Sequence, residues 1–216
     1  MRIVRDIEQG TPEWFALRAG KVTGSNFGKV LAKGSGATRR SYMLDLIAER
    51  WGAQREPYSN AAMEWGTQTE PQARAMYELM SGDEVEEVTL ILHSDDVSCS
   101  PDGLVGNDGG IEIKCPNSST HVDYRLRGAL PSAYKPQVQG FLWIAEREWC
   151  DFVSFDPRVR ADKQFFCVRV YRDEDYIKTL AAEVERFVAE LLALLDDDDT
   201  VPGLDDISAG IQEVEA

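Results

Sequence analysis

The spacing of apolar residues predicts helices in the first 80 residues and strands after them. Thr11-Pro12-Glu13 has the composition of a helix start, with a capping hydroxyl, a first-turn proline and an early acid. Thr23 is a second candidate cap. The apolar positions that recur at helical spacing are, helix by helix, Trp14 and Leu17; Phe27, Val30 and Leu31; Met43, Leu46, Ile47 and Trp51; and Ala73, Met76, Tyr77 and Met80.

From residue 88 onward, short runs of β-forming residues replace the helical stripes. The expected strands are 88–93, 97–100, 111–115, 150–155 and 165–171, with a turn at 106–110, a helix around 137–144 and a long closing helix with an apolar face from Ile177 to Leu195. This order predicts an α/β fold with a central mixed β-sheet flanked by helices. We expect a single domain over residues 1–195 and an acidic C-terminal tail over 196–216.

The formal net charge of −15 is unfavourable for binding nucleic acid, but the charges are unevenly distributed. Residues 196–216 carry eight acids and no Lys or Arg, whereas residues 1–50 carry nine bases against five acids. Nucleic acid would therefore have to meet a local basic surface. No apolar run approaches the roughly 20 residues of a membrane span, and the N-terminus lacks a signal-peptide core, so a cytoplasmic protein is expected.

The residues that suggest chemistry are Asp102, Glu112 and Lys114. Side chains alternate along a strand, so Glu112 and Lys114 share one face, and the turn at 106–110 brings Asp102 beside Glu112. Two neighbouring carboxylates repel each other unless a cation such as Mg²⁺ joins them. Such a site can hydrolyse a phosphodiester, with Lys114 orienting or deprotonating the water and a nearby cation lowering the Lys114 pKa. Alone, the pattern fits a surface hairpin with an ordinary Glu–Lys pair equally well.

Further segments give this pattern a context. In chain order they are QGTPEWFALRAGKVTGSNF, MEWGTQTEPQAR, CSPDGL, GIEIKCP, SAYKPQVQGFLWI and FVSFDPR. Together they resemble the phage lambda exonuclease family, the YqaJ-type viral recombinases or alkaline exonucleases, within the PD-(D/E)xK nuclease superfamily. The resemblance extends from Gly10 to about Leu195 and implies a restriction-endonuclease-like core.

The resemblance also implies an activity and an assembly. Members of this family use Mg²⁺, for which Mn²⁺ can substitute, and two ions are expected at the site. They degrade linear double-stranded DNA from the 5′ end, release mononucleotides and leave a 3′ overhang for a single-strand annealing protein. A homotrimeric ring is expected for the protein itself.

Carried over by motif, the resemblance assigns roles to individual residues. Asp102, Glu112 and the backbone carbonyl of Ile113 would bind metal, and Lys114 would act on the water. Glu70, expected at the start of a helix, and Gln137, on the helix after the third strand, would complete the catalytic group.

A pocket for the 5′-terminal phosphate would be formed by Arg18, Ser25 and Ser100. Physical reasoning supports two of these assignments. Ser25 follows the Thr23 cap, where free N–H groups attract an anion, and Arg18 can add a charge-assisted contact. Taken alone, a serine at the position of Ser25 is more often an ordinary capping residue, and an arginine at the position of Arg18 is more often a surface salt-bridge partner.

The glycine-rich loop after residue 32 departs from the family pattern, because it is shorter and differently charged. It offers Lys33, Arg39 and Arg40, which would either follow the phosphate backbone of DNA or form only a solvated basic loop. Two other functions stay open from the sequence. One is an endonuclease of the same superfamily, and the other is a non-catalytic protein that binds DNA ends.

Overall fold

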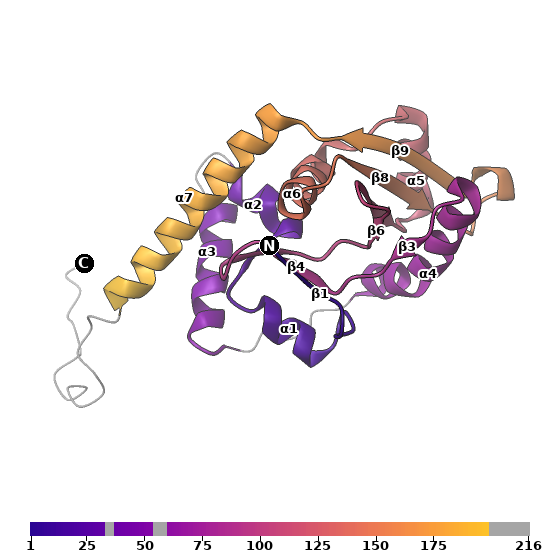
Figure 1. Cartoon of the computed structure of the whole chain (residues 1–216). Coiled ribbons are helices and arrows are strands. Elements are labelled where there is room, and N and C mark those ends of the chain that lie inside the picture. Colours follow the sequence, from indigo (N-terminus) through magenta and orange to yellow (C-terminus); the bar gives the residue numbers. More distant parts are fainter. Residues whose placement is uncertain (33–36, 54–59, 199–216) are drawn as a thin grey trace.

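The computed structural model describes residues 1–32, 37–53 and 60–198 (Figure 1). The helices are α1 (Pro12–Arg18), α2 (Phe27–Val30), α3 (Ala37–Arg50), α4 (Ala61–Ser81), α5 (Ser118–Arg127), α6 (Lys135–Ala145) and α7 (Glu174–Asp198), with 3₁₀ turns η1 (Gly24–Asn26), η2 (Ser132–Tyr134) and η3 (Ala161–Lys163). The strands are β1 (Arg2–Val4), β2 (Val22–Thr23), β3 (Val85–Glu86), β4 (Leu90–Leu92), β5 (Val97–Cys99), β6 (Gly103–Val105), β7 (Gly109–Lys114), β8 (Trp149–Phe155) and β9 (Phe165–Tyr171). The α/β class with mixed sheets and flanking helices is confirmed.

The described residues form two sheets rather than the single central sheet expected. One has the strand order β1-β4-β5-β2 and the other β3-β6-β7-β8-β9. In the second sheet β7 runs antiparallel to β6 and parallel to β8, which makes the sheet mixed. The chain crosses between the sheets at Ser100-Pro101-Asp102, where Pro101 has no N–H to continue the ladder of β5.

The sequence pattern located the long elements well and missed the short ones. Strands β8 and β9 begin and end within one residue of the expected ranges. Strands β1, β2 and β3 have two or three residues each, which is too short for a periodic signal. Helix α5 was also missed, although Asn117 caps it by accepting from the Thr120 N–H at 2.9 Å. Helix α7 continues to Asp198, past the expected start of the acidic tail.

Two expectations about helix starts differ from the structure. Thr23 precedes the 3₁₀ turn η1 and makes no capping bond; its hydroxyl instead accepts from the Asn26 side chain at 2.8 Å. Helix α4 begins at Ala61 after an Asn60 cap, so Glu70 lies in the middle of the helix and not at its start. Pro71 lies inside α4, where it removes one backbone hydrogen bond of the helix. The burial of Ala73 and Tyr77 against the sheet stabilises the same stretch and offsets this loss.

Helices cover both faces of the five-stranded sheet. Ala73 and Tyr77 of α4 pack on Ile111 and Ile113 of β7, as the alternation of that strand predicted. The opposite face contacts α6 so closely that a Cβ atom at Gly110 would lie 2.2 Å from the Phe141 ring. A larger core joins α2, α3, α6 and α7. Among the described helices none is both long and apolar enough to cross a bilayer.

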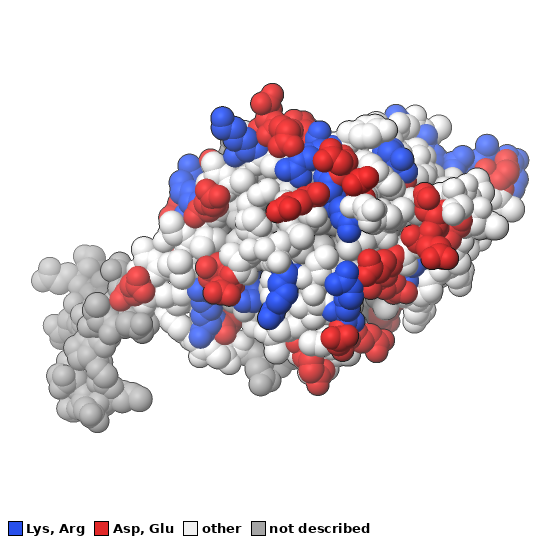
Figure 2. Space-filling view, viewed as in Figure 1, with Lys and Arg blue, Asp and Glu red and all other residues white. Residues whose placement is uncertain are grey.

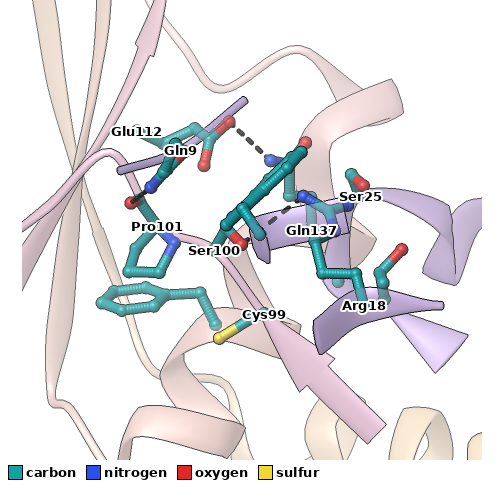
Figure 3. Close-up of a pocket in the computed structure, with 12 residues that line it drawn as sticks. Gln9, Arg18, Ser25, Cys99, Ser100, Pro101, Glu112 and Gln137 are labelled. Atoms are coloured by element: carbon teal, nitrogen blue, oxygen red, sulfur yellow. Dashed lines mark hydrogen bonds between the residues drawn. The ribbon is translucent and has the colours of Figure 1, made fainter. Parts of the chain in front are cut away.

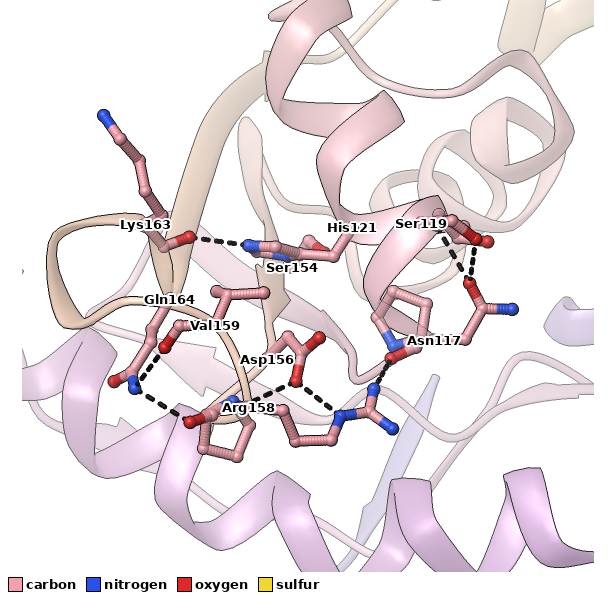
Figure 4. A network of polar contacts seen from close by, with 12 residues as sticks. Asn117, Ser119, His121, Ser154, Asp156, Arg158, Val159, Lys163 and Gln164 are labelled. Atoms are coloured by element: carbon pink, nitrogen blue, oxygen red, sulfur yellow. Dashed lines mark hydrogen bonds and ion pairs between the residues drawn. The ribbon is translucent and has the colours of Figure 1, made fainter.

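A polar network fastens the ends of β7 and β8 together (Figure 4). Buried His121 lies 2.8 Å from the Ser154 hydroxyl and 2.8 Å from the Lys163 carbonyl. The fully buried Asp156 accepts from the Arg158 N–H and Nε at 2.9 and 2.7 Å, and Arg158 donates to the Pro116 carbonyl at 2.8 Å. The end of β7, which carries the candidate residues, is therefore fixed by these contacts to the segment that follows β8.

Candidate active site

The β6–β7 hairpin brings the two central carboxylates together. Its register pairs Gly103 with Ile111, so Asp102 lies beside the next residue of β7, Glu112. The Asp102 Oδ2 atom accepts from the Ile113 N–H at 2.6 Å. Because the N–H and C=O of one residue in a strand point to the same edge, the Ile113 carbonyl faces the Asp102 side of β7. Asp102, Glu112 and this carbonyl thus present oxygen atoms to one region.

Glu112 is a buried carboxylate with two donors. Its side chain is 4% exposed, and Oε1 accepts from the Gln137 amide at 2.6 Å and from the Lys114 ammonium. Burial raises the pKa of Glu112 to about 7, although Lys114 acts in the opposite direction. Gln137 reaches this oxygen from the first turn of α6. Helix α6 therefore supplies a donor to a carboxylate on the neighbouring strand.

Lys114 lies between Glu112 and an aromatic ring. Its Nζ atom is 5.5 Å from the centroid of Tyr134, at the end of η2. Burial by itself lowers the Lys114 pKa, but the Glu112 and Asp102 carboxylates raise it more, so the pKa lies above its ordinary value. The lowering of the Lys114 pKa by a neighbouring metal ion stays a prediction.

Glu70 approaches from α4, on the other side of the hairpin. Burial raises its pKa to about 7, and the charge of Asp102 adds to the increase. Its Oε1 atom accepts from Arg74 at 2.7 Å, and the same Arg74 nitrogen donates to the Asp102 backbone carbonyl at 3.3 Å. The structure thus joins Glu70 to Asp102 through an arginine that the sequence reasoning did not single out.

The donor set suits a hard divalent cation. The carboxylates of Asp102 and Glu112 repel each other in a buried place, which a cation would relieve. The hydrogen bonds seen in the described residues use only Oδ2 of Asp102 and Oε1 of Glu112. In the part of the chain that the structure describes, no three His, Cys, Asp or Glu side chains are grouped so that they could hold a metal ion by themselves. An ion would thus bind two carboxylates, a carbonyl, water and substrate oxygens, which is the pattern Mg²⁺ favours.

The three residues expected to bind phosphate line one cavity, of about 120 Å³, which also contains Glu112 and Gln137 (Figure 3). Arg18, the last residue of α1, donates to the Ser100 hydroxyl at 3.4 Å. Ser25 is exposed in η1, on the neighbouring wall. The candidate phosphate residues and the carboxylate site therefore share a common space.

Arg39 and Arg40 of the expected basic loop do not line this cavity. Lys33 lies outside the described residues. Arg39 forms a two-pronged ion pair with Glu190 of α7, at 2.7 and 3.0 Å, and its guanidinium lies 4.8 Å from the Phe187 ring centroid. Arg40 is exposed on α3. Arg39 is thus held against α7, whereas contact of Arg40 with a DNA backbone stays a prediction.

A larger cavity, of about 1,370 Å³, lies between the N-terminal segment, α1 and α4. Asp102, Glu70 and Arg74 line it, and Gln9 and Trp14 line both this cavity and the smaller one. Lys29 and Arg5 add positive charge. The candidate carboxylates therefore lie where a small cavity and a wide one meet.

Sequence reasoning missed several residues that hold the site. Arg74 contacts Glu70, and the Arg18 guanidinium lies over Trp14 with 4.0 Å to the ring centroid. In each of these two pairs the residues are four positions apart on a helix, which places their side chains on the same face. This spacing could have revealed both contacts. Tyr134 beside Lys114 had no such signal, because it comes from a distant part of the chain.

Comparisons with known proteins identify the family of this chain. The model of the YqaJ-like viral recombinase domain matches residues 13–148. The alkaline exonuclease LHK-Exo from Laribacter hongkongensis has 44% identity and a TM-score of 0.83, covering 88% of this chain and 96% of that one. Its structure in complex with dAMP has 45% identity, the same coverage and the same TM-score.

Two more distant relatives share parts of the pattern. A phage-related exonuclease from Haemophilus somnus 129PT has 18% identity and a TM-score of 0.63, covering 81% of this chain and 96% of that one, and shows the fold alone. The uncharacterized protein ExoD of Escherichia coli K12 is 30% identical over 70 residues, which is 32% of this chain and 79% of that protein. The protein described here therefore belongs to the YqaJ-like viral recombinase family and is homologous to an alkaline exonuclease over 88% of its length.

Proposed function

We propose that this protein is a metal-dependent exonuclease that degrades linear double-stranded DNA in the 5′-to-3′ direction. It would release mononucleotides and leave 3′ single-stranded overhangs for recombination by strand annealing. The observation that carries this proposal is the shared cavity: Arg18, Ser25 and Ser100 line the same small space as Glu112 and Gln137. A group that binds a terminal phosphate next to a group that cleaves a phosphodiester is what an end-specific nuclease needs.

The proposed polarity is supported by the residues and the size of the small cavity. Its volume of about 120 Å³ admits the end of a strand but no continuous duplex. A 5′-phosphate held by Arg18, Ser25 and Ser100 would place the first phosphodiester beside Glu112, so each cleavage would remove one nucleotide. The remaining DNA would approach through the larger cavity, where Lys29 and Arg5 add positive charge.

The chemistry is assigned residue by residue. Asp102, Glu112 and the Ile113 carbonyl would hold Mg²⁺ or Mn²⁺, with two ions expected, and Glu70 would support this group. A bound ion supplies charge that stabilises the phosphate in the transition state. Lys114, kept protonated by Glu112 and Asp102, would donate to the attacking water or the phosphate. Gln137 would hold Glu112 in place through its hydrogen bond at 2.6 Å.

The relatives support an exonuclease in particular. The protein that is 44% identical to this chain is an alkaline exonuclease, and its complex with dAMP contains a nucleoside monophosphate. A mononucleotide is what removal of one residue at a time would yield. We extend the proposal to a homotrimeric ring and an annealing protein as partner in a bacterial or phage-infected cell, both carried over from the family.

The experiment uses a linear duplex labelled at either end, carrying a 5′-phosphate or a 5′-hydroxyl, with and without Mg²⁺. We expect Mg²⁺-dependent release of labelled mononucleotide from the 5′ end, faster with the phosphate. Arg18→Ala should remove most of the preference for the phosphate while both substrates are still cleaved. Nicking of closed circular DNA would instead indicate an endonuclease, and binding without hydrolysis would indicate a protein that only binds ends.

A further inference from the structure

Arg74 occupies a place between the two sides of the carboxylate site. It lies on α4, four residues after Glu70, and its side chain is only 13% exposed. One of its terminal nitrogens contacts Glu70 Oε1 at 2.7 Å and the Asp102 carbonyl at 3.3 Å. The other lies 2.9 Å from Glu87, whose side chain is 70% exposed. A single guanidinium therefore joins α4 to the crossing between the two sheets.

The helix that carries Arg74 is itself fixed to the sheet. Tyr77, nearly one turn further along α4, donates to the buried Asp151 carboxylate at 2.8 Å. Asp151 is on β8 and is held by Arg169 through hydrogen bonds of 2.9 and 2.8 Å. Because α4 is anchored in this way, Arg74 holds the Asp102 main chain at a fixed position relative to the sheet.

The environment of Arg74 is not that of an ordinary stabilising ion pair. Its Nε atom is buried without a hydrogen-bond partner among the residues that the structure describes. An unsatisfied buried donor costs free energy. The arginine nevertheless directs a terminal nitrogen to Glu70 and to the main chain of Asp102. Its side chain is therefore oriented for these two contacts, and the unpaired Nε lowers the stability of the fold.

We propose that Arg74 is a positioning residue that sets the affinity of the site for its metal ion, by fixing the Glu70 carboxylate and the Asp102 main chain relative to each other. This inference rests on the proposed function, because it takes Asp102 as a metal ligand. Residues that orient metal ligands typically change metal affinity by about 10- to 100-fold when they are replaced.

The sharpest variant is Arg74→Lys, because it keeps the positive charge. Replacement by a neutral residue would also remove a charge that repels the metal, and the two effects would oppose each other. Lysine carries its donors on one nitrogen and cannot reproduce the planar fork whose two terminal nitrogens contact Glu70, Glu87 and the Asp102 carbonyl. A change of metal affinity in Arg74→Lys therefore reports geometry and not charge.

Arg50 provides a matched control. Its side chain is 22% exposed and, like that of Arg74, joins a carboxylate to a backbone carbonyl: Asp96 at 2.6 Å and Gly20 at 2.8 Å, without a second carboxylate such as Glu87 among the described residues. Arg50→Lys should cost stability of a similar kind without altering the metal site. Thermal unfolding of both variants identifies any loss of folded protein.

The experiment measures the dissociation constant for Mn²⁺ by calorimetry without DNA, and the Mg²⁺ concentration that gives half-maximal release of mononucleotides at saturating DNA. We expect Arg74→Lys to raise both by about 10-fold, with kcat largely recovered at high Mg²⁺, and Arg50→Lys to leave both unchanged. Wild-type metal dependence in a folded Arg74→Lys protein would overturn the inference. So would an increase confined to the KM for DNA, which would make Arg74 a substrate contact.

Failure of the inference can be separated from failure of the proposed function. If the unmodified protein releases no mononucleotides from linear DNA with Mg²⁺, the proposed function is wrong. If it does so and Arg74→Lys binds Mn²⁺ as tightly as the unmodified protein, only the role of Arg74 is wrong. If Arg74→Lys fails to fold, Glu87→Gln is the second variant, an exposed change that releases one end of the guanidinium. It should raise the Mn²⁺ dissociation constant by a smaller factor. Unchanged Mn²⁺ binding in Glu87→Gln would also count against the role of Arg74.

Discussion

At the scale of single residues, the site is defined by charges that burial makes costly. Glu112 is nearly inaccessible, and its carboxylate is satisfied on one oxygen by Lys114 and Gln137. Burial raises the pKa of Glu112 and of Glu70 to about 7. Such groups are maintained where chemistry or a bound cation needs them, because an apolar residue would be less costly at the same place.

Lys114 is the residue whose removal should separate chemistry from binding. We expect Lys114→Ala to lower kcat for DNA hydrolysis by about 100-fold or more, because a group that donates to the reacting atoms typically contributes that much. Binding of duplex DNA in Ca²⁺, measured by fluorescence anisotropy, should change little.

Lys135→Ala is the control for Lys114→Ala. Lys135 also pairs with a carboxylate, at 2.9 Å, and lies over an aromatic ring, 4.4 Å from the Tyr176 centroid, but its partner Asp173 is not one of the candidate-site carboxylates. It should keep nearly full activity. Near-normal turnover by a folded Lys114→Ala protein would show that the lysine has no part in the reaction.

At the scale of elements, the site depends on how β7 is held on each side. Its apolar face rests on α4, its polar face receives Gln137 from α6, and its end is tied to β8 through Arg158 and Pro116. Arg158 also lies over Trp65 of α4, 4.2 Å from the ring centroid. The elements that carry Glu70, Glu112 and Lys114 therefore meet at this arginine.

The carboxylate that holds Arg158 should make stability depend on pH. Burial raises the pKa of Asp156, but hydrogen bonds from Arg158 lower it more, so the pKa lies below its ordinary value of 3.8. A lowered acid pKa stabilises the fold above the unfolded value, and this stabilisation is lost as the pH falls through the folded value. Asp156→Asn should therefore destabilise the protein at pH 6 and have a smaller effect at about pH 3.

Urea denaturation of both proteins at the two pH values measures this difference. Asp123→Asn, which removes an exposed partner of Arg127, serves as the control and should alter stability little at pH 6. An equal loss of stability in Asp156→Asn at both pH values would mean that packing, and not the charge of Asp156, fastens the two strand ends.

At the scale of the whole molecule, net charge is a poor guide to the partner. The chain carries −15, yet Figure 2 shows basic and acidic side chains interspersed over one face. The cations Arg18, Lys29 and Arg5 line the two cavities. In the proposed function nucleic acid would meet this local surface, whereas the total charge governs solubility and repulsion between molecules.

The proposed ring gives a prediction at this scale. Size-exclusion chromatography with light scattering should give a mass three times that of the 24.2 kDa chain. Degradation of a long duplex should then be processive, because DNA enclosed by a ring cannot readily dissociate between steps. A monomeric mass with fully processive degradation would contradict the ring as the source of processivity.

Particular elements show how far the sequence could predict this fold. Strands β8 and β9 and helix α7 were predictable because their apolar residues repeat over seven or more positions. The start of α4 was not, because Pro71 looks like a boundary and its burial against the sheet is a tertiary effect. The division into two sheets likewise depends on pairings between distant strands, such as β1 with β4, that no local pattern encodes.

By itself, the sequence determined the family, the α/β class and the carboxylates and lysine at the centre, because these depend on ordered motifs and on alternation along one strand. The tertiary structure alone decided that Arg74 joins Glu70 to Asp102, that Lys114 lies beside Tyr134, and that the phosphate residues share a cavity with Glu112. Those contacts join residues far apart in the chain or on different elements, and only the packing of α4, α6 and the two sheets sets their distances.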